Sequence, residues 1–169
     1  DQPAKEYLEQ IGINIPKRKL TDLSAADYAL VMNVNAGGAL NMIQAVLPVM
    51  RAKGRGTVIN VSSIAGLRGL KLAGAAYCAS KAAMNAIGTT VHAEEKANGI
   101  RVTNVCPGEI NTPILDQRPP ELQRTAAERA LMLQPDDVAA AVLMVASLPQ
   151  RAHIPQLIIR PTNGENYQA

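Results

Sequence analysis

Hydrophobic residues along this chain follow two different periods, and the change between them predicts where helices and strands lie. Between residues 28 and 50, apolar side chains recur at helical spacing, which predicts an amphipathic helix. Residues 57–62 and 100–106 are short, mostly apolar runs with many β-branched residues, which is typical of buried strands. Residues 75–98 return to the helical period and predict a long helix.

Capping and helix-breaking residues predict the ends of these elements. Ser24, followed three residues later by an aspartate, is a helix start signal, and Pro48 predicts a kink near the end of that helix. Gly99 predicts the C-cap of the second long helix. Pro135, followed by two aspartates, predicts a further helix that runs to about residue 148.

The remaining segments complete an alternation of helices and strands. Residues 121–132 predict a short helix and residues 157–160 a third strand, whereas 64–74 and 112–120 are rich in glycine or proline and predict loops. The order helix, strand, helix, strand, helices, strand is typical of a parallel sheet covered by helices. The predicted fold class is therefore α/β, in one domain that spans residues 1–169.

The composition indicates a globular chain with a core of small aliphatic residues. Of 169 residues, 47% are hydrophobic but only 2% are aromatic, with neither Phe nor Trp. The net charge of +3 is spread along the chain, without the large basic patch or aromatic platforms of a nucleic-acid-binding protein. No apolar run approaches the roughly 20 residues of a membrane span, and no signal-peptide pattern is present. We therefore expect no nucleic acid and no membrane among the partners.

Cysteine and histidine usage predicts neither a disulfide framework nor a metal site. Cys78 and Cys106 lie among small or apolar residues, which favours two reduced thiols and a cytoplasmic location. His92 and His153 are far apart in the sequence, so each is expected to be a surface or helix-end histidine rather than a metal ligand.

The candidate chemistry is concentrated in the segment Tyr77-Cys78-Ala79-Ser80-Lys81. Residues four apart in a helix share one face, so Tyr77 and Lys81 would be neighbours. An ammonium close to a phenol favours the phenolate and would lower the pKa of Tyr77 toward neutral pH. Tyr77 is therefore predicted to act as a general acid or base.

Four motifs in this chain resemble the short-chain dehydrogenase/reductase family in their order and spacing. The motifs are Val34-Asn35 with Gly37, Ile59-Asn60-Val61-Ser62-Ser63-Ile64-Ala65-Gly66, Tyr77-Cys78-Ala79-Ser80-Lys81 and Asn104-Val105-Cys106-Pro107-Gly108. The resemblance implies a Rossmann-like, doubly wound parallel sheet flanked by helices. It also implies an oxidoreductase that uses NAD or NADP to interconvert a small-molecule alcohol and a carbonyl by hydride transfer.

The resemblance implies a role for each candidate residue. Ser63 would hold the carbonyl oxygen, and Tyr77 would donate or accept its proton. Lys81 would lower the pKa of Tyr77 and, together with Tyr77, contact the nicotinamide ribose, while Asn35 would hold a water that links Lys81 to solvent. Residues 114–132 would form the substrate lid. The residues that would contact the nicotinamide carboxamide are Pro107, Gly108, Ile110 and Thr112.

Structural alternatives exist for these residues. Ser63 could cap the chain after its strand, and Asn35 could kink a helix. Lys81 could be a solvated helix lysine, and Thr112 could serve in a turn. Ser62 is expected on the side of the strand end opposite to Ser63.

The resemblance covers residues 11–162 and leaves 1–10 and 163–169 as tails. The strand, glycine-rich turn and helix that bind the cofactor pyrophosphate in the family have no match here, so we expect an incomplete Rossmann-like domain that lacks roughly 80–90 residues. The second hypothesis for function is therefore a non-catalytic, truncated remnant that acts as an oligomeric scaffold or needs a missing N-terminal half.

A face of small residues on the helix 75–98 predicts self-association. Its members are Ala75, Ala76, Ala79, Ala82, Ala83, Ala86 and Gly88. Small residues allow close helix approach, and the corresponding helix pairs across a twofold axis in the family that the chain resembles. We therefore expect a homodimer or homotetramer. Packing of these residues against the sheet is the alternative, and the two are compatible.

Overall fold

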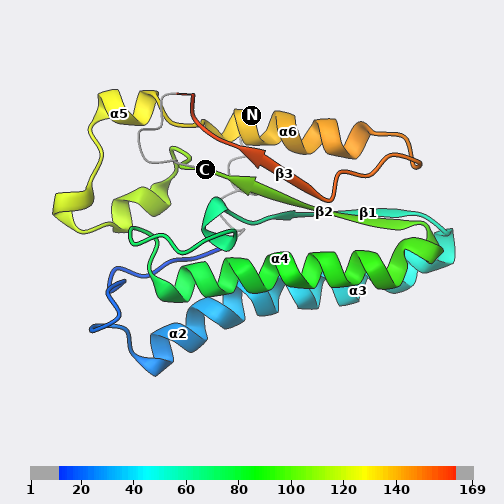
Figure 1. Ribbon diagram of the computed structural model, residues 1–169, viewed down its shortest axis with the longest axis horizontal. Coiled ribbons are helices and arrows are strands. Elements are labelled where there is room, and N and C mark those ends of the chain that lie inside the picture. Colours follow the sequence, from blue (N-terminus) through cyan, green and yellow to red (C-terminus); the bar gives the residue numbers. More distant parts are fainter. Residues whose placement is uncertain (1–11, 163–169) are drawn as a thin grey trace.

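The computed structural model describes residues 12–162, and at their centre lies a parallel sheet of three strands. The strands are β1 (Gly56–Val61), β2 (Ile100–Pro107) and β3 (Gln156–Ile159), in the spatial order β1-β2-β3 (Figure 1). Val58 pairs with Val102, and Val105 pairs with Leu157. Every strand lies within one residue of its predicted range, and the predicted parallel sheet is confirmed.

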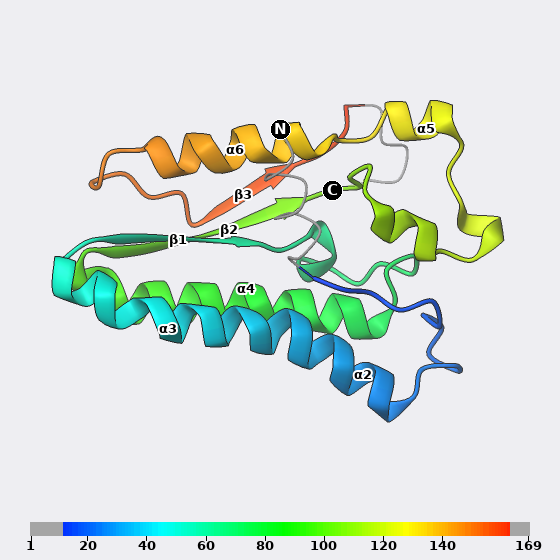
Figure 2. The same cartoon turned by 180° about the vertical axis from the view of Figure 1, so that it is seen from behind.

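Helices cover both faces of this sheet. They are α2 (Ala25–Met32), α3 (Gly38–Lys53), α4 (Ala75–Glu95), α5 (Ala126–Ala130) and α6 (Pro135–Ser147). α3 and α4 run side by side along one face, and α6 lies on the other (Figures 1 and 2). The fold is therefore α/β with a Rossmann-like arrangement, as the alternation of periods predicts.

The predicted caps are present, and the long helical segment also contains a turn that the sequence did not predict. The Ser24 hydroxyl accepts a hydrogen bond from the Asp27 amide, and Gly99 ends the long helix with φ of 71° in the left-handed region. Pro48 lies inside α3, whereas the irregular turn is the π-helical segment Asn33–Gly37 between α2 and α3. The hydrophobic period does not reveal a π-helical turn, because one extra residue per turn changes it little.

The helix predicted over residues 121–132 is much shorter in the structure. Only Ala126–Ala130 is α-helical, because Thr125 and Glu128 form a capping box that starts the helix there. Pro119 and Pro120 precede it and favour a 3-10 turn over a longer α-helix. The sequence Thr-x-x-Glu was the available signal for this later start.

Three apolar clusters make up the core. Val61, Val105 and Val138 join the sheet to α6, and Ile43 with Val91 joins α3 to α4 on the opposite face. A third cluster, around Val31, Ile15 and Ala76, fixes α2 to the start of α4.

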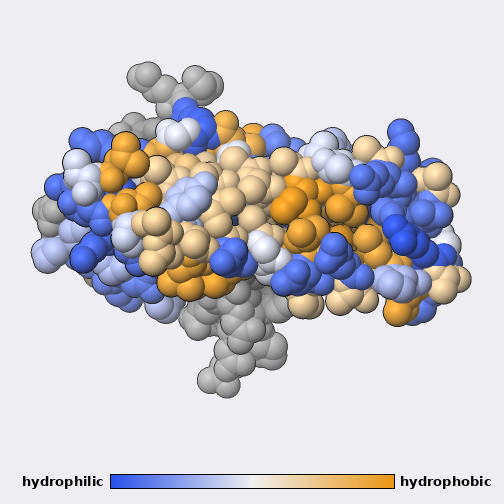
Figure 3. All heavy atoms as spheres, turned by 90° about the horizontal axis from the view of Figure 1, so that it is seen from below, coloured by the Kyte–Doolittle hydropathy of each residue, from blue (hydrophilic) through white to orange (hydrophobic). Residues whose placement is uncertain are grey.

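The outer side of the helical layer is apolar in places. The continuous helix Ala25–Lys53 is long and apolar enough, by length and composition, to cross a bilayer, and it stands out in this respect among the described residues. Figure 3 shows apolar residues gathered on the helical face below the sheet, where Met42 and Val49 are exposed. On α4, Ala82 and Ala86 are exposed while Ala76 and Gly88 are buried, so the small residues occupy both faces of the helix.

At the amino end of the strands the polar groups are well matched. Arg101 on β2 is buried and donates to the carbonyls of Leu148, Pro149 and Ala152, at and just after the C-cap of α6, and to the Thr57 hydroxyl. These bonds hold the loop that follows α6 against β2.

The two histidines also meet at the amino end of the strands. The rings of His92 and His153 lie with their centroids 3.8 Å apart, and His92 lies in the last turn of α4, a helix-end position as predicted. The pairing could not be predicted, because it depends on how the end of α4 and the loop before β3 meet.

Candidate functional site

The carboxyl end of the sheet brings Ser63, Tyr77 and Lys81 together. Ser63 follows β1 directly, and Tyr77 lies in the first turn of α4. The Ser63 hydroxyl is hydrogen-bonded to the Tyr77 phenol, and the Lys81 Nζ lies 5.7 Å from the centre of the Tyr77 ring. Tyr77 and Lys81 therefore share one face of α4, as their spacing predicts.

Ser63 serves both the turn and the site. Its hydroxyl accepts a hydrogen bond of 3.1 Å from the Ala65 amide and so caps a 3-10 turn. Ser62 points away from this position, since its hydroxyl donates to the Lys81 carbonyl in the interior. The capping role weighed for Ser63 is thus real, and it holds the hydroxyl close to Tyr77.

The pKa of Tyr77 differs from the sequence-based expectation. Burial raises it to about 12, and the hydrogen bond from Ser63 and the charge of Arg18 only partly offset that rise. The expectation that Lys81 brings this pKa toward neutral is therefore wrong for the chain by itself. The reason is that desolvation of the phenolate outweighs the nearby charges.

Lys81 is itself an unusual lysine. Its side chain is buried, with the whole residue 2% exposed, and its Nζ donates to the Val61 carbonyl at 3.3 Å. Burial lowers its pKa to about 8. The solvated helix lysine considered as an alternative is excluded, because a lysine with so little contact with water is held there by its surroundings.

Asn35 lies at the π-helical turn and ties three segments together. Its amide nitrogen donates to the Ile13 carbonyl and to the Ser80 hydroxyl, while its Oδ1 accepts from the Ile13 amide. The side chain is therefore fully used in structure, which matches the alternative of a helix-kink residue. Because the Asn35 side chain is already bonded, a proton relay at this turn would have to use atoms other than that side chain.

Gly12 shows how closely these groups are packed. A Cβ atom at Gly12 would lie 3.0 Å from both the Asn35 Oδ1 and the Lys81 Nζ. The Lys81 ammonium, buried in this close packing and 5.7 Å from the centre of the Tyr77 ring, is chemically suited to the hydroxyls of a nicotinamide ribose. The residues present thus fit the nicotinamide end of NAD or NADP.

The four residues expected to contact the nicotinamide carboxamide have different surroundings. Pro107 ends β2, and the Gly108 amide donates to the Ile159 carbonyl at 2.8 Å. Ile110 forms a bridge with Leu133 and packs against the core. Thr112 caps a 3-10 turn through its carbonyl, so its hydroxyl remains available for a ligand.

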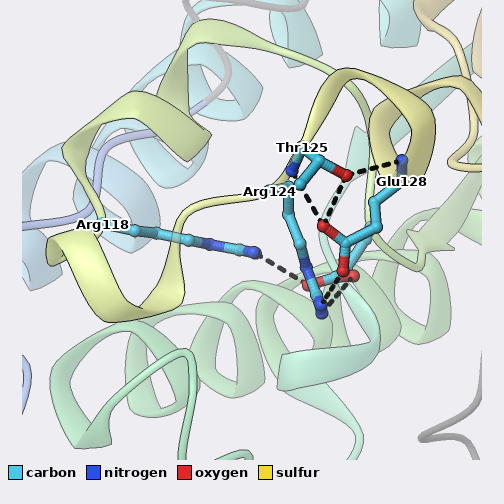
Figure 4. Close-up of polar contacts among 5 residues, drawn as sticks. Arg118, Arg124, Thr125 and Glu128 are labelled. Atoms are coloured by element: carbon cyan, nitrogen blue, oxygen red, sulfur yellow. Dashed lines mark hydrogen bonds and ion pairs between the residues drawn. The ribbon is translucent and has the colours of Figure 1, made fainter.

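Sequence reasoning missed an arginine cluster beside this site. Arg118 and Arg124 both form ion pairs with the carboxylate of Glu109, and Arg124 also pairs with Glu128. Figure 4 shows Arg118 and Arg124 reaching the same carboxylate from two sides of the loop. Burial lowers the pKa of Arg18, and the charge of Arg118 lies near enough to lower it further. The pair Arg124–Glu128 has the i,i+4 spacing that a sequence can show, but no spacing predicts that Arg18 lies near Arg118, because the two come from distant loops.

The site geometry agrees with the comparisons with known proteins. A family model described as short chain dehydrogenase matches residues 10–123. The sepiapterin reductase of Chlorobaculum tepidum is 30% identical over 146 residues, which are 86% of this chain and 57% of that protein. The chain belongs to the short-chain dehydrogenase/reductase family.

Solved structures show the same likeness. Levodione reductase superimposes with a TM-score of 0.79 at 26% identity, covering 89% of this chain and 62% of that chain. Serine dehydrogenase from Escherichia coli gives a TM-score of 0.73 at 26% identity, covering 89% and 60%. A serine dehydrogenase complexed with NADP+ gives 0.77 at 25% identity, covering 94% and 66%. This chain thus spans about three-fifths of the length of the proteins it matches.

Proposed function

We propose that this chain carries the proton-transfer half of an NAD(P)-dependent oxidoreductase that interconverts an alcohol and a carbonyl. The observation that carries the proposal is the meeting of Ser63, Tyr77 and the buried Lys81 at the carboxyl end of β1. Ligands of open α/β sheets bind at this edge. Membership in an oxidoreductase family supports the same reaction class.

The residues divide the reaction between them. A carbonyl oxygen gains negative charge as its carbon is reduced, and the Ser63 hydroxyl is placed to donate a hydrogen bond to it. The Tyr77 phenol donates the proton in reduction and, as phenolate, accepts it in oxidation. NAD(P)H, when bound, supplies the hydride. Lys81 holds the ribose hydroxyls and favours the phenolate of Tyr77 when its ammonium is charged.

Burial gives these residues a definite starting state. With the pKa of Tyr77 at about 12, the phenol is protonated at neutral pH, which suits a proton donor to a carbonyl. Oxidation of an alcohol needs the phenolate, and it therefore requires the pKa of Tyr77 to fall when the site is filled. Reduction is accordingly the direction that the resting site favours.

Thr112 and the backbone of Pro107 and Gly108 are proposed to hold the nicotinamide carboxamide. The Thr112 hydroxyl makes no capping bond, and the two backbone positions lie at the carboxyl end of β2. Ile110 is proposed to contact the nicotinamide only through its exposed part, because its inner side packs against the core.

Self-association is also proposed. Exposed Ala82 and Ala86 on α4 and exposed Met42 on α3 form an apolar helical face that a second copy could cover in a homodimer or homotetramer. Light scattering at micromolar concentration tests this, and a monomer would contradict it.

A direct experiment tests the proposed reaction. The protein is titrated with NADH and NADPH while thermal shift is followed, and then given neutral ketones with NADPH deuterated at C4 of the nicotinamide. The expected result is a shift with one of the two cofactors and deuterium on the carbinol carbon of the product. Cofactor binding without deuterium transfer would reject the reaction but keep the site.

A second function, an oligomeric scaffold without activity, is favoured by one observation. The chain spans about three-fifths of the length of its relatives, and its β1 edge has no neighbouring strand among the described residues. If neither cofactor binds at millimolar concentration while the protein remains folded and oligomeric, the scaffold function replaces the enzyme.

A further inference from the structure

Arg18 is fixed against the start of α4 and points one unused donor inward. Its Nε donates to the Ile15 carbonyl at 2.8 Å, and its Nη1 donates to the Leu72 carbonyl at 3.4 Å. Its backbone oxygen lies 2.8 Å from where a Cβ of Gly74 would be, three residues before Tyr77. The remaining nitrogen, Nη2, is buried and has no partner among the described residues.

Arg118 presents a second donor of the same kind. Its side chain is 8% exposed, and its Nη2 donates to the Glu109 carboxylate at 2.8 Å. Its Nη1 is buried without a partner among residues 12–162. Glu109 follows the carboxyl end of β2, so this guanidinium lies on the strand edge where the site forms. Two buried N–H groups on different loops thus lack an acceptor in the described part of the chain, and Arg118 and Tyr77 both lie close enough for their charges to act on Arg18.

The charges around these donors do not balance within the chain. Glu109 and Glu128 provide two carboxylates for Arg118 and Arg124. Arg18 bonds only to backbone carbonyls, so its positive charge lacks a carboxylate partner in the described part of the chain. A guanidinium that is withdrawn from water without a counter-charge is costly, and an incoming anion would remove that cost.

We propose that Arg18 and Arg118 anchor a carboxylate of the substrate, so that the compound reduced at Tyr77 is an oxo acid and the compound oxidised is a hydroxy acid. This inference rests on the proposed function, because it assigns the substrate class of the same site. Two unused donors, one from each guanidinium, match the two oxygens of a carboxylate. Arg18 contacts the segment that leads into α4, which places the anchor beside the proton donor.

The chemistry that follows is simple to write. The carboxylate stays bound to the two guanidiniums and takes no part in bond changes. The carbonyl carbon gains a hydride, and its oxygen gains the proton of the Tyr77 hydroxyl, so a secondary alcohol forms while the cofactor is oxidised. The anchor fixes which carbonyl of the substrate reaches Ser63 and Tyr77.

Paired ligands separate binding from turnover. The probes are 3-oxobutanoate, 4-oxopentanoate and 5-oxohexanoate, each compared with its methyl ester, and binding is measured by calorimetry with NADP+ present. At least one acid is expected to bind about tenfold more tightly than its ester. Arg18→Gln and Arg118→Gln are expected to remove that preference, and Arg55→Gln, which changes an exposed arginine at the amino end of β1, is expected to keep it.

The outcomes distinguish the two proposals. If an acid binds through both arginines but is never reduced, the anchor stands and the proposed reaction fails. If neutral ketones are reduced and acids bind no better than esters, the reaction stands and the anchor is overturned. If either variant weakens NADPH instead of the acid, the donors belong to a cofactor phosphate and the substrate class is again overturned. Should Arg18→Gln unfold by circular dichroism, Arg118→Gln decides, because Arg118 joins no core segments.

Discussion

The buried Arg101 and the half-buried Arg18, at opposite ends of the sheet, show how the same kind of side chain serves structure in one place and function in another. Arg101 donates to three carbonyls at the end of α6 and to a hydroxyl, and none of its nitrogens is a buried atom without a partner. Arg18 uses two nitrogens for backbone carbonyls and leaves a third buried without a partner. Complete pairing indicates a structural residue, whereas incomplete pairing at a strand's carboxyl end indicates a site.

The two ends of the sheet differ in the same way as a whole. At the amino end, Arg101 and the pair Arg51–Glu95 are satisfied by the chain, and burial there stabilises the fold. At the carboxyl end lie the buried Lys81 and the half-buried Tyr77, whose charged forms desolvation disfavours. Substitutions at the carboxyl end should therefore change activity more than stability, and those at the amino end should do the reverse.

The largest effect is expected from Tyr77→Phe. Loss of the proton donor should lower turnover by about 1000-fold, since general acid catalysis contributes on that scale. The free energy of unfolding should change by less than about 1 kcal/mol, because the ring that packs the site is kept. Steady-state kinetics and urea denaturation measure the two quantities. Tyr28→Phe, at an exposed position of α2, is the matched control and should change neither.

Near-normal turnover of Tyr77→Phe would mean that another group supplies the proton. In that case proton transfer by Tyr77 would no longer explain why substitutions at the carboxyl end of the sheet are expected to change activity.

Because Lys81 is buried at the carboxyl end of the sheet, the stability of the folded chain should depend on pH. Its folded-state pKa of about 8 lies below the ordinary value of 10.5. Between these values the unfolded chain holds more protons, so stability rises with pH through that window. Relative to Lys81→Met, the wild-type chain should gain about 3 kcal/mol between pH 8 and pH 10.5. Urea denaturation at several pH values measures this gain.

Other groups titrate in the same pH range, so the contribution of Lys81 must be measured as the difference in stability between the wild-type chain and Lys81→Met. The raised pKa values of Tyr77 and Cys106 lower stability as pH rises above about 9, with the opposite sign to Lys81. Both groups remain in Lys81→Met, so the Tyr77 contribution cancels in the difference, and that of Cys106 cancels apart from its charge coupling to Lys81. Lys53→Met, at the exposed end of α3, should show no such gain. An unchanged pH profile in Lys81→Met would contradict the buried, weakly basic lysine.

Arg101→Met tests the other end of the sheet. The carbonyls of Leu148, Pro149 and Ala152 would lose their donor, so the free energy of unfolding should fall by about 2 kcal/mol. Turnover per folded molecule should stay the same, because Arg101 lies at the amino end of β2. Denaturation and active-site-normalised kinetics measure the two effects. A loss of turnover without a loss of stability would contradict the assignment of the amino end of the sheet to stability and the carboxyl end to activity.

How far the sequence predicts this molecule depends on whether a feature is local. The strands, α4 and the cap at Gly99 depend on neighbours in the chain, and pattern alone predicted them. The pair Tyr77 and Lys81 is likewise local, since helical spacing brings the two side chains together. The motif resemblance added the family, which no periodicity could supply.

The features missed at the site depend on segments that are distant in the sequence, whereas the π-helical turn and the late start of α5 are local features that the hydrophobic period does not show. Arg18 and Arg118 are 100 residues apart, and no spacing rule joins them. The pKa of Tyr77 was predicted with the wrong sign because the sequence shows the nearby ammonium but not the burial that opposes it. Burial is a property of the folded chain. It raises the pKa of Tyr77, and it also removes the unused nitrogens of Arg18 and Arg118 from water.

The smallest effect is expected at the stacked histidines. Burial and the charge of His153 lower the pKa of His92, and nearby Lys96 adds to this, while a hydrogen bond with the Ile100 backbone partly opposes it. The folded chain therefore takes up this proton at lower pH than the unfolded chain, and stability falls as pH falls through about 6.5. The loss should be below about 1 kcal/mol, because His92 is only partly buried. NMR titration of the imidazole C2 proton measures the pKa, and His153→Asn should raise it. A pKa of His92 that does not change in that variant would show that stacking at the amino end of the sheet carries no electrostatic coupling.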